Sequence, residues 1–259
     1  MEYNTLIINN IEDVMVVTMS RPAALNALNR QTMRELHHFF VESPLPTSMK
    51  GVVLTGAGDK AFVAGADIKE FLGLGAQASS DLSAYGHGIF NAIENFPVPV
   101  VAAMNGFALG GGLELAMACH IRLASEKAKF GQPEVNLGTI PGYGGTQRLV
   151  RLVGLGRAMH WLMTGEMIDA PTALQAGLIT GIYPGERLQD EAIKLVRTIA
   201  AKAPLAIREI VRTTLANFDP DTDGFQLEIE RFGYLFETAD FQEGVQAFLE
   251  KRKADFQGR

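Results

Sequence analysis

Short apolar runs alternate with polar turns in the first part of the chain, and this pattern predicts strands. The runs at residues 6–8 and 14–19 lie on either side of Asn9 and Asn10, so we expect a hairpin whose turn is at those asparagines. Arg21-Pro22 follows. Because proline cannot donate to a strand ladder, the second strand should end there.

Further along, apolar runs of strand length are separated by amphipathic segments of helix length. The strand-like runs are residues 51–55, 99–105 and 121–124. The helical pattern occurs at residues 33–41, where Asn29 is placed to act as N-cap, and at 81–95. The small and polar stretch 73–80 predicts a mobile loop before the second helix. The recurring unit is therefore strand, glycine loop and helix.

The pattern becomes mainly helical from about residue 142, with Asp169 and Pro171 as start signals for a helix that ends near Gly177. Amphipathic helices beyond residue 186 carry large apolar side chains: Phe225, Phe232, Leu235, Phe236 and Phe248. A small helical segment cannot bury that many large side chains alone, so they should pack on the core or on another subunit. We expect an α/β core at 1–190 and a helical region at 191–259.

The composition is typical of a globular protein and excludes several functional classes. Of the 259 residues, 47% are hydrophobic and 20% are charged. The net charge is −6 and the basic residues are scattered, so the sequence does not indicate a basic surface that binds nucleic acid. Cys119 is the single cysteine and no Cys/His cluster has ligand spacing, so neither a disulfide nor a metal site is expected. The sequence shows no leader and no apolar run of about 18 residues, which favours a cytoplasmic location without a membrane partner.

Two glycine-containing segments carry backbone N–H groups that can converge on one developing negative charge. In AFVAGAD, Ala66 offers its N–H among small side chains that let a ligand approach closely. In NGFALGGGLE, Gly111 lies at the start of an expected helix, where N–H groups lack intrahelical acceptors. Two other interpretations stay open: the glycines serve close strand-to-helix packing, and Asp67 is a plain N-cap.

Glu114 and Glu134 are candidate acid/base groups beside those segments. Glu114 falls in the first turn of the expected helix among apolar neighbours, and a buried carboxylate is costly without partners. The alternative is an exposed charge that favours a helix N-terminus. Glu134 precedes a glycine-rich loop and, taken alone, is equally well an ordinary loop residue. Together, the carboxylates and the N–H donors predict an enzyme that acts on an activated acyl group.

Other catalytic machineries are not indicated. The glycines match neither G-x-x-x-x-G-K-[ST] nor G-x-G-x-x-G, the two nucleotide-binding patterns. G-x-S-x-G is absent, and the five histidines have no recognisable serine or cysteine partner. A nucleotide cofactor and a nucleophilic triad are therefore not expected.

Five motifs, in order along the chain, resemble the enoyl-CoA hydratase/isomerase (crotonase) family. They are RPAALNAL, AFVAGADIKEF, NGFALGGGLELA, GQPEVNLGTIPGYGGTQRL and EKRKADF. The resemblance spans nearly the whole chain. It implies an α/β fold, a crotonase-like spiral of ββα units with a C-terminal helical trimerisation region, assembled as a homotrimer or a dimer of trimers.

The resemblance also implies roles for individual residues. Ala66 and Gly111 match the oxyanion hole for the thioester oxygen, and Glu114 and Glu134 match the two catalytic glutamates. The residues that match contacts to coenzyme A are Ala24, Leu25, Ala66, Asp67, Ile68, Lys69, Lys253 and Phe256. The last two would reach the adenine and 3′-phosphate end from a neighbouring subunit. His120 departs from the family pattern, which more often has Asp there.

The activity implied is hydration of a trans-2-enoyl-CoA to a 3-hydroxyacyl-CoA. Coenzyme A is part of the substrate, and no metal or separate cofactor is implied. Glu134 would take the water proton and deliver one to C2, while Glu114 would orient the water. Isomerases of this family typically keep only the position of Glu134, whereas hydratases keep both. A Δ3,Δ2-enoyl-CoA isomerase and a non-catalytic acyl-CoA or RNA-binding member remain alternatives.

Overall fold

The structure is a computed structural model that describes residues 1–46 and 48–259. Its strands are β1 (Leu6–Ile11), β2 (Val14–Met19), β3 (Gly51–Gly56), β4 (Ala61–Val63), β5 (Val100–Met104), β6 (Phe107–Leu109), β7 (Ile121–Ser125), β8 (Lys129–Gly131), β9 (Ile168–Asp169) and β10 (Gly181–Tyr183). Its α-helices are α1 (Arg30–His37), α2 (Ala76–Glu94), α3 (Gly111–Ala118), α4 (Gly145–Val153), α5 (Leu155–Thr164), α6 (Ala170–Gln175), α7 (Leu188–Ala200), α8 (Pro204–Ala216), α9 (Gly224–Phe236) and α10 (Ala239–Glu250). A π-helical turn, η2 (His38–Glu42), extends α1, and 3₁₀ turns occur at η1 (Pro22–Ala24), η3 (Ile68–Phe71), η4 (Pro133–Leu137) and η5 (Gly185–Arg187).

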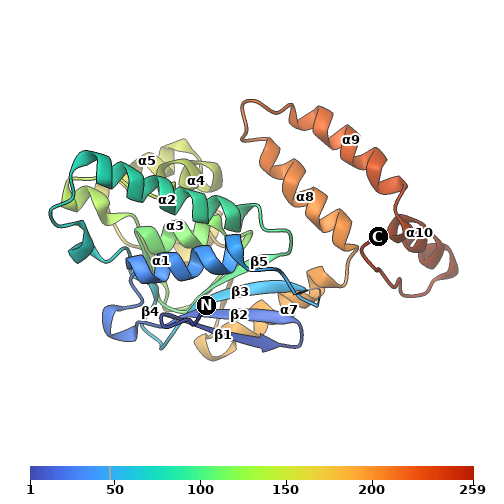
Figure 1. Cartoon of the computed structure of the whole chain (residues 1–259), viewed down its shortest axis with the longest axis horizontal. Helices are drawn as coiled ribbons and strands as arrows, with labels where there is room; N and C mark the ends of the chain where they lie inside the picture. Colours follow the sequence, from blue (N-terminus) through green and yellow to red (C-terminus); the bar gives the residue numbers. More distant parts are fainter. Residues whose placement is uncertain (47) are drawn as a thin grey trace.

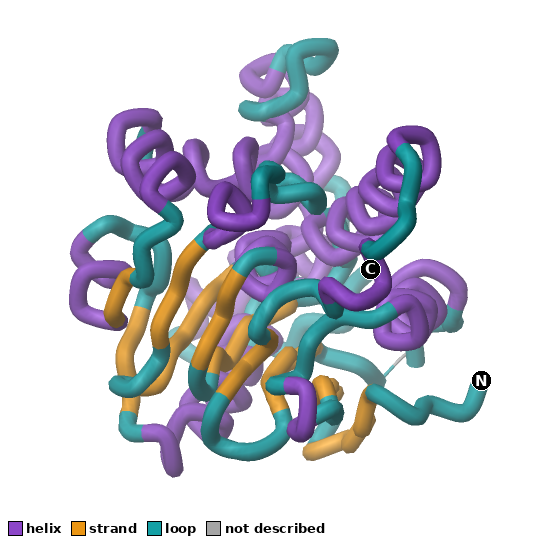
Figure 2. The backbone as a smooth tube through the Cα atoms, turned by 90° about the vertical axis from the view of Figure 1, so that its left-hand side faces the viewer, coloured by secondary structure: helices purple, strands orange, loops and turns teal. Residues whose placement is uncertain are grey.

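The strands form two sheets between which the chain alternates. The larger has the order β1-β2-β3-β5-β7-β10 and the smaller β4-β6-β8-β9. Strands β3, β5 and β7 of the larger sheet are each followed by a strand of the smaller one, and then by α2, α3 or α4. Figure 2 shows the strands lying side by side with helices around them. This repeated step is the predicted spiral of ββα units, and the expected α/β class is confirmed.

Both faces of the larger sheet are covered, and its central strands β3, β5 and β7 are mostly apolar. In β3, Val52 and Leu54 face the main core under α1 to α3, whereas Val53 faces the opposite side. There it meets Ile193 and Val196 of α7. Alternate side chains of a strand point to opposite faces, so a continuous apolar run is what a sheet covered on both sides requires. Figure 1 shows α1 to α3 on one side of the strands and α7 on the other.

The N-terminal hairpin is confirmed, but its turn is not at the asparagines. Ile11 pairs with Val14, which leaves Glu12 and Asp13 as a two-residue loop. Both have positive φ, 49° and 69°, the geometry of a type I′ hairpin turn. The turn prediction was wrong because β1 is an edge strand, which can carry polar residues on its exposed side.

Residues 73–80 are also not all loop, since α2 begins at Ala76. The first five residues of the helix are exposed. Their side chains are small or polar and include no β-branched residue, so they continue a helix without an apolar stripe to reveal it. Asn29 does cap α1, and its side chain accepts from the Thr32 N–H.

The last three helices extend away from the two sheets (Figure 1). No residue of α9 is buried, and Phe225 and Phe248 are 85% and 83% exposed. These rings therefore do not pack on the core of their own chain. The boundary at residue 190 between the core and the helical region stays a prediction. Helix α7, which begins at Leu188 and so crosses this boundary, packs on the larger sheet. Within the described residues, no helix is both long enough and apolar enough to cross a membrane.

Candidate active site

The triple glycine fixes where α3 starts and how closely it approaches β4. Gly110 has φ 49° and ψ −127°, a conformation that side chains disfavour. A Cβ on Gly112 would overlap the main-chain carbonyl of Val63. Close packing, one of the interpretations left open by the sequence, is therefore correct for Gly112. It also brings the N-terminus of α3 against the segment that carries Ala66.

The N–H groups of Ala66 and Gly111 are not used by the surrounding backbone ladder. The parallel bridge between Leu28 and Ala66 is made by the Leu28 N–H to the Gly65 carbonyl and the Asp67 N–H to the Leu28 carbonyl. Neither of these two hydrogen bonds uses the N–H of Ala66. Gly111 is the first residue of α3, where an N–H has no intrahelical acceptor. Both donors remain for a ligand.

The two donor segments and Glu134 meet in one place. A Cβ built on Gly110 would lie 3.8 Å from the Cα of Gly65 and 2.7 Å from Oε1 of Glu134. Only glycine at position 110 leaves room for that carboxyl group. The structure thus brings Ala66, Gly111 and Glu134 together from three distant parts of the chain.

Glu114 is buried, with 1% of its surface exposed. Its Oε1 accepts the N–H groups of Tyr143 and Gly145, each at 2.7 Å, while Oε2 takes part in neither bond. Burial raises the pKa of Glu114, and the two N–H donors and the charge of Arg148 oppose that shift. The exposed-charge alternative is wrong, because this carboxyl group is held inside the molecule in a fixed orientation.

Glu134 lies in η4 and is half-buried. Burial raises the pKa of Glu134 to about 7, its own backbone N–H opposes the shift, and the nearby charge of Glu114 adds to it. With the amide of Gln132 oriented so that its nitrogen faces Glu134, the nitrogen lies 3.0 Å from Oε1 and 3.1 Å from Oε2. A carboxyl group that titrates near neutral pH can both take and give a proton.

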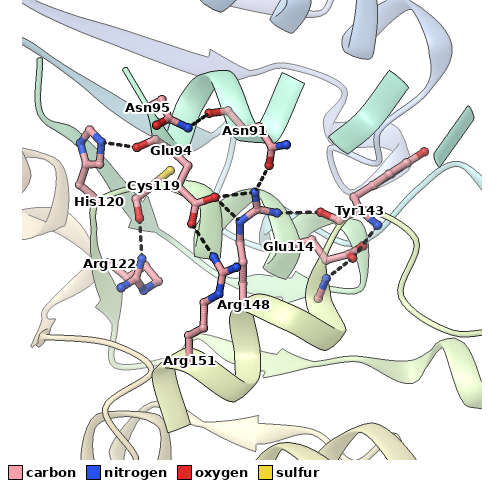
Figure 3. Close-up of polar contacts among 11 residues, drawn as sticks. Asn91, Glu94, Asn95, Glu114, Cys119, His120, Arg122, Tyr143, Arg148 and Arg151 are labelled. Carbon is pink, nitrogen blue, oxygen red and sulfur yellow. Dashed lines mark hydrogen bonds and ion pairs between the residues drawn. The ribbon is translucent and has the colours of Figure 1, made fainter. Parts of the chain in front are cut away.

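Arg148 supports the loop that holds Glu114 (Figure 3). It donates to the main-chain carbonyl of Tyr143 at 3.0 Å, and its Nε and Nη2 both donate to Oε2 of Glu94, at 3.1 and 2.7 Å. Asn91 accepts a further bond from it at 2.7 Å. The main chain at Tyr143 is thus held on both sides, by Glu114 through its N–H and by Arg148 through its carbonyl. This fixes the position of Glu114 relative to α2.

A scan against family models matches residues 9–259 to the family described as enoyl-CoA hydratase/isomerase. The chain belongs to the enoyl-CoA hydratase/isomerase family. It is 43% identical over 257 residues to a crotonyl-CoA hydratase of Syntrophomonas wolfei, with 99% of each chain covered. It is also 44% identical over 250 residues to a mitochondrial enoyl-CoA hydratase of Pongo abelii, covering 94% of this chain and 83% of the relative.

Solved structures of this family have the same fold. A crystal structure of an enoyl-CoA hydratase from Bacillus anthracis superposes with a TM-score of 0.92 at 35% identity, over 99% of this chain and 100% of the other. One from Geobacillus kaustophilus gives a TM-score of 0.91 at 39% identity, with both chains covered completely. The crotonase fold is therefore that of the whole chain.

The segments predicted to contact coenzyme A lie side by side at the edge of this site. The Leu25 carbonyl accepts the Ala64 N–H at 3.0 Å, which joins the segment of Ala24 and Leu25 to that of Ala66. Leu25 has φ 50° and is 38% exposed. Beyond Ala66, Ile68 is 53% exposed and Lys69 is also exposed, both in η3. Both segments are therefore accessible from solvent.

The structure excludes one interpretation left open for Asp67, that of a plain N-cap. It occupies the cap position of η3, but its side chain makes no cap hydrogen bond. Instead it pairs with the guanidinium of Arg21 at 2.9 Å. This pair joins Asp67 to the segment that precedes Ala24 and Leu25.

The two terminal residues, Lys253 and Phe256, lie far from this site in their own chain. Both follow α10, which is at the opposite end of the molecule from α3 (Figure 1). Lys253 is exposed, whereas the Phe256 ring packs near Gly244 of α10 and lines an apolar cavity there. If either residue serves an active site, that site belongs to another subunit.

Gln132, Tyr143 and Arg148 contribute to the site and were not singled out in the sequence. All three lie within the motif GQPEVNLGTIPGYGGTQRL. Nothing in the sequence around them indicated that they would support either glutamate. His120 is built into the fold: its Nδ1 accepts the Val100 N–H at 2.9 Å and its Nε2 lies 3.0 Å from the Glu94 carbonyl. Within residues 1–46 and 48–259, no group of three or more metal-ligating side chains is present.

Proposed function

We propose that the chain is an enoyl-CoA hydratase that adds water to a short trans-2-enoyl-CoA with Glu134 as acid/base and Glu114 as the group that orients the water. The observation that carries the proposal is the pairing of two carboxyl groups in different environments beside two unused backbone donors. Full-length relatives that carry the names crotonyl-CoA hydratase and short-chain-enoyl-CoA hydratase support the activity.

The backbone donors act on the thioester oxygen. As water adds at C3, negative charge moves through the conjugated system to that oxygen. The N–H groups of Ala66 and Gly111 stabilise it there, with the positive end of α3 behind Gly111. Loss of one such donor typically costs about 10²–10³ in rate.

The two glutamates divide the proton chemistry. Glu114 keeps Oε2 for the water, because Oε1 is held by two main-chain donors. Glu134, ionised, takes a proton from the water as its oxygen bonds to C3, and then delivers a proton to C2. Glu134 takes up one proton and gives up one, so it returns to its ionised state, and no cofactor is needed. A positioned acid/base group contributes about 10²–10⁴-fold.

The remaining family activity, Δ3,Δ2-enoyl-CoA isomerisation, needs proton transfer but no water. The test compares kcat/KM for hydration of crotonyl-CoA with kcat/KM for isomerisation of trans-3-hexenoyl-CoA. We expect hydration to be the faster reaction and Glu114→Gln to reduce it more than it reduces isomerisation, because only hydration uses the oriented water. Faster turnover of the 3-enoyl substrate would contradict the proposal and favour the isomerase.

The coenzyme A part would lie across Ala24 and Leu25 on one side and residues 66–69 on the other. Ala66 then contributes to both binding and catalysis. Lys253 and Phe256 would contact the adenine end of a substrate held by a neighbouring subunit, since they are remote from their own active site. This division requires an oligomer.

We further propose that the protein is a homotrimer or a dimer of trimers, located in the cytoplasm. The exposed rings of α9 and α10, including Phe225, Phe232 and Phe248, support assembly, because a large exposed apolar surface marks an interface. Cys119 is a buried free thiol, which fits a reducing compartment.

A further inference from the structure

The ring of Tyr143 lies between two glycines that belong to different helices. A Cβ built on Gly86 of α2 would overlap Cδ1 and Cε1 of the ring. A Cβ on Gly111 of α3 would lie 3.3 Å from Cδ2 and 3.4 Å from Cε2, on the opposite edge. Phe90 packs edge-on at 5.5 Å between ring centroids. The ring is 6% exposed, so it fills the space between α2 and α3.

Gly86 is unusual because it lies in the interior of α2, where glycine lowers helix stability. Its φ is not positive, so the backbone does not require glycine there. The ring of Tyr143 does require it, because any side chain at position 86 would occupy the same space. Gly86 and Tyr143 therefore complement each other in volume. Gly86 has no side chain on α2, and the ring of Tyr143 from the loop fills that space.

The ring lies beside the residues that the proposed function assigns to the reacting end of the substrate. The main-chain N–H of Tyr143 binds Oε1 of Glu114, and the ring lies against Gly111, which carries a proposed oxyanion donor. With the thioester oxygen held at Gly111 and Ala66, C2 and C3 lie next to the glutamates in the proposed binding mode. Carbons beyond C3 then extend away from the coenzyme A segments, past Glu114, toward the loop of Tyr143.

We propose that the side chain of Tyr143 closes the acyl end of the active site and so restricts the enzyme to short acyl chains. The inference rests on the proposed function and assigns the chain-length limit to one residue. Burial, together with the charges of Glu114 and Glu70, raises the pKa of the Tyr143 phenol to about 12. The group thus stays neutral, which suits a wall against an alkyl chain.

The test measures kcat/KM for trans-2-enoyl-CoA substrates of four, six, eight and ten carbons. In the wild type we expect a fall with length, and in Tyr143→Phe the same profile, because the ring remains. In Tyr143→Ala we expect the ratio of the eight-carbon to the four-carbon value to rise at least about tenfold, since one methylene in an apolar pocket is worth about 10–200-fold. The readout is the ratio of the two values, which a loss of activity shared by both substrates does not change.

A second variant acts in the opposite direction. Gly86→Ala adds a methyl group against the ring and pushes it toward the substrate, so the six-carbon substrate should lose more than the four-carbon one. In Gly86→Ala with Tyr143→Ala, the added methyl group meets no ring and that loss should disappear. Gly88→Ala is the matched control on the same helix, because nothing lies within 4 Å of a Cβ there.

The outcomes separate the inference from the function on which it rests. A wild type that hydrates eight-carbon and four-carbon substrates equally well, or a Tyr143→Ala variant with an unchanged length profile, overturns the role of Tyr143 and leaves the hydratase intact. A wild type that hydrates none of the substrates overturns the proposed function itself.

Discussion

Glu114 and Glu134 are the same residue type with different environments, and the proposed roles rest on this difference. The carboxyl group of Glu114 is fixed by the main-chain donors of Tyr143 and Gly145. The carboxyl group of Glu134 faces the amide of Gln132, and burial raises the pKa of Glu134 to about 7. A residue that must gain and lose a proton in each turnover benefits from such a pKa. The same burial lowers the stability of the folded protein when Glu134 is ionised.

The raised pKa of Glu134 predicts a pH-dependent change in stability. Its folded-state pKa of about 7 lies above the ordinary value of 4.5, so the folded protein binds that proton more tightly than the unfolded chain. The associated stability is complete below pH 4.5 and is lost as pH rises through 7. Glu134→Gln carries no charge, so in urea unfolding it should be more stable than the wild type at pH 8.

The pH dependence of the difference tests this assignment. The stability advantage of Glu134→Gln over the wild type should be clear at pH 8 and smaller at pH 5. The control variant is Glu186→Gln, at an exposed glutamate, which should not show this change in stability difference with pH. A constant difference between the wild type and Glu134→Gln at both pH values would show that burial does not raise the pKa of Glu134.

The sequence singled out four candidate site residues, which the structure brings close together, but not the residues that support them. Ala66, Gly111, Glu114 and Glu134 lie in glycine-containing segments whose local pattern indicates chemistry. Arg148, by contrast, meets Glu94 at a separation of 54 residues, and such a contact leaves no local mark. Gln132 and Tyr143 were missed for the same reason, since their roles depend on what other elements bring beside them.

At the scale of elements, α3 is the part that places the reaction centre. It begins at Gly111, contributes Glu114 in its first turn, and packs without any intervening side chain on the carbonyl of Val63. The sequence predicted β1, β2, β3, β5 and β7 from apolar runs, and α1 and α6 with their caps at Asn29 and Asp169. It did not predict the two- and three-residue strands of the smaller sheet, which are too short to show a pattern. Boundaries were less predictable: the turn at Glu12-Asp13 and the start of α2 carry weak local signals.

Close packing at Gly112 predicts a severe effect of one methyl group. Gly112→Ala would place a Cβ in the Val63 carbonyl, and because this neighbour is main chain, α3 must move away from β4. Overpacking of this kind costs about 1–3 kcal/mol. The shift also separates the N–H of Gly111 from that of Ala66, so kcat for crotonyl-CoA should fall by up to about 10²–10³.

The control for this variant is Gly156→Ala in α5, where nothing lies within 4 Å of an added Cβ. Thermal unfolding and kcat should both be close to wild type in that protein. A Gly112→Ala variant with normal stability and normal kcat would mean that α3 does not depend on this contact.

At the scale of the whole molecule, the C-terminal helices carry the observation that supports the proposed oligomer. They extend from the core with their aromatic rings exposed, and the terminal residues predicted to contact coenzyme A lie at their far end (Figure 1). The sequence indicated too many large apolar residues for these helices to bury. It did not show whether the rings pack on the core, and in the structure they do not.

We therefore expect analytical ultracentrifugation to give a mass that is three or six times 28.1 kDa. Phe232→Asp introduces a charge on a ring that is 65% exposed in the chain alone, and it should shift the protein to smaller species. Gln226→Asp adds the same side chain elsewhere on α9 as a control. A monomeric wild type would exclude a contribution of Lys253 and Phe256 to a neighbouring site.

The most direct test of the account is the initial rate of crotonyl-CoA hydration, followed by loss of the enoyl-thioester absorbance. It compares the wild type with Glu134→Gln, Glu114→Gln and the exposed control Glu186→Gln. We predict rapid loss in the wild type and the control, and a decrease of about 10²–10⁴-fold in each active-site variant, because each glutamate performs a separate part of the proton chemistry. Equal rates in wild type and Glu134→Gln would contradict the account, since the acid/base would then lie elsewhere.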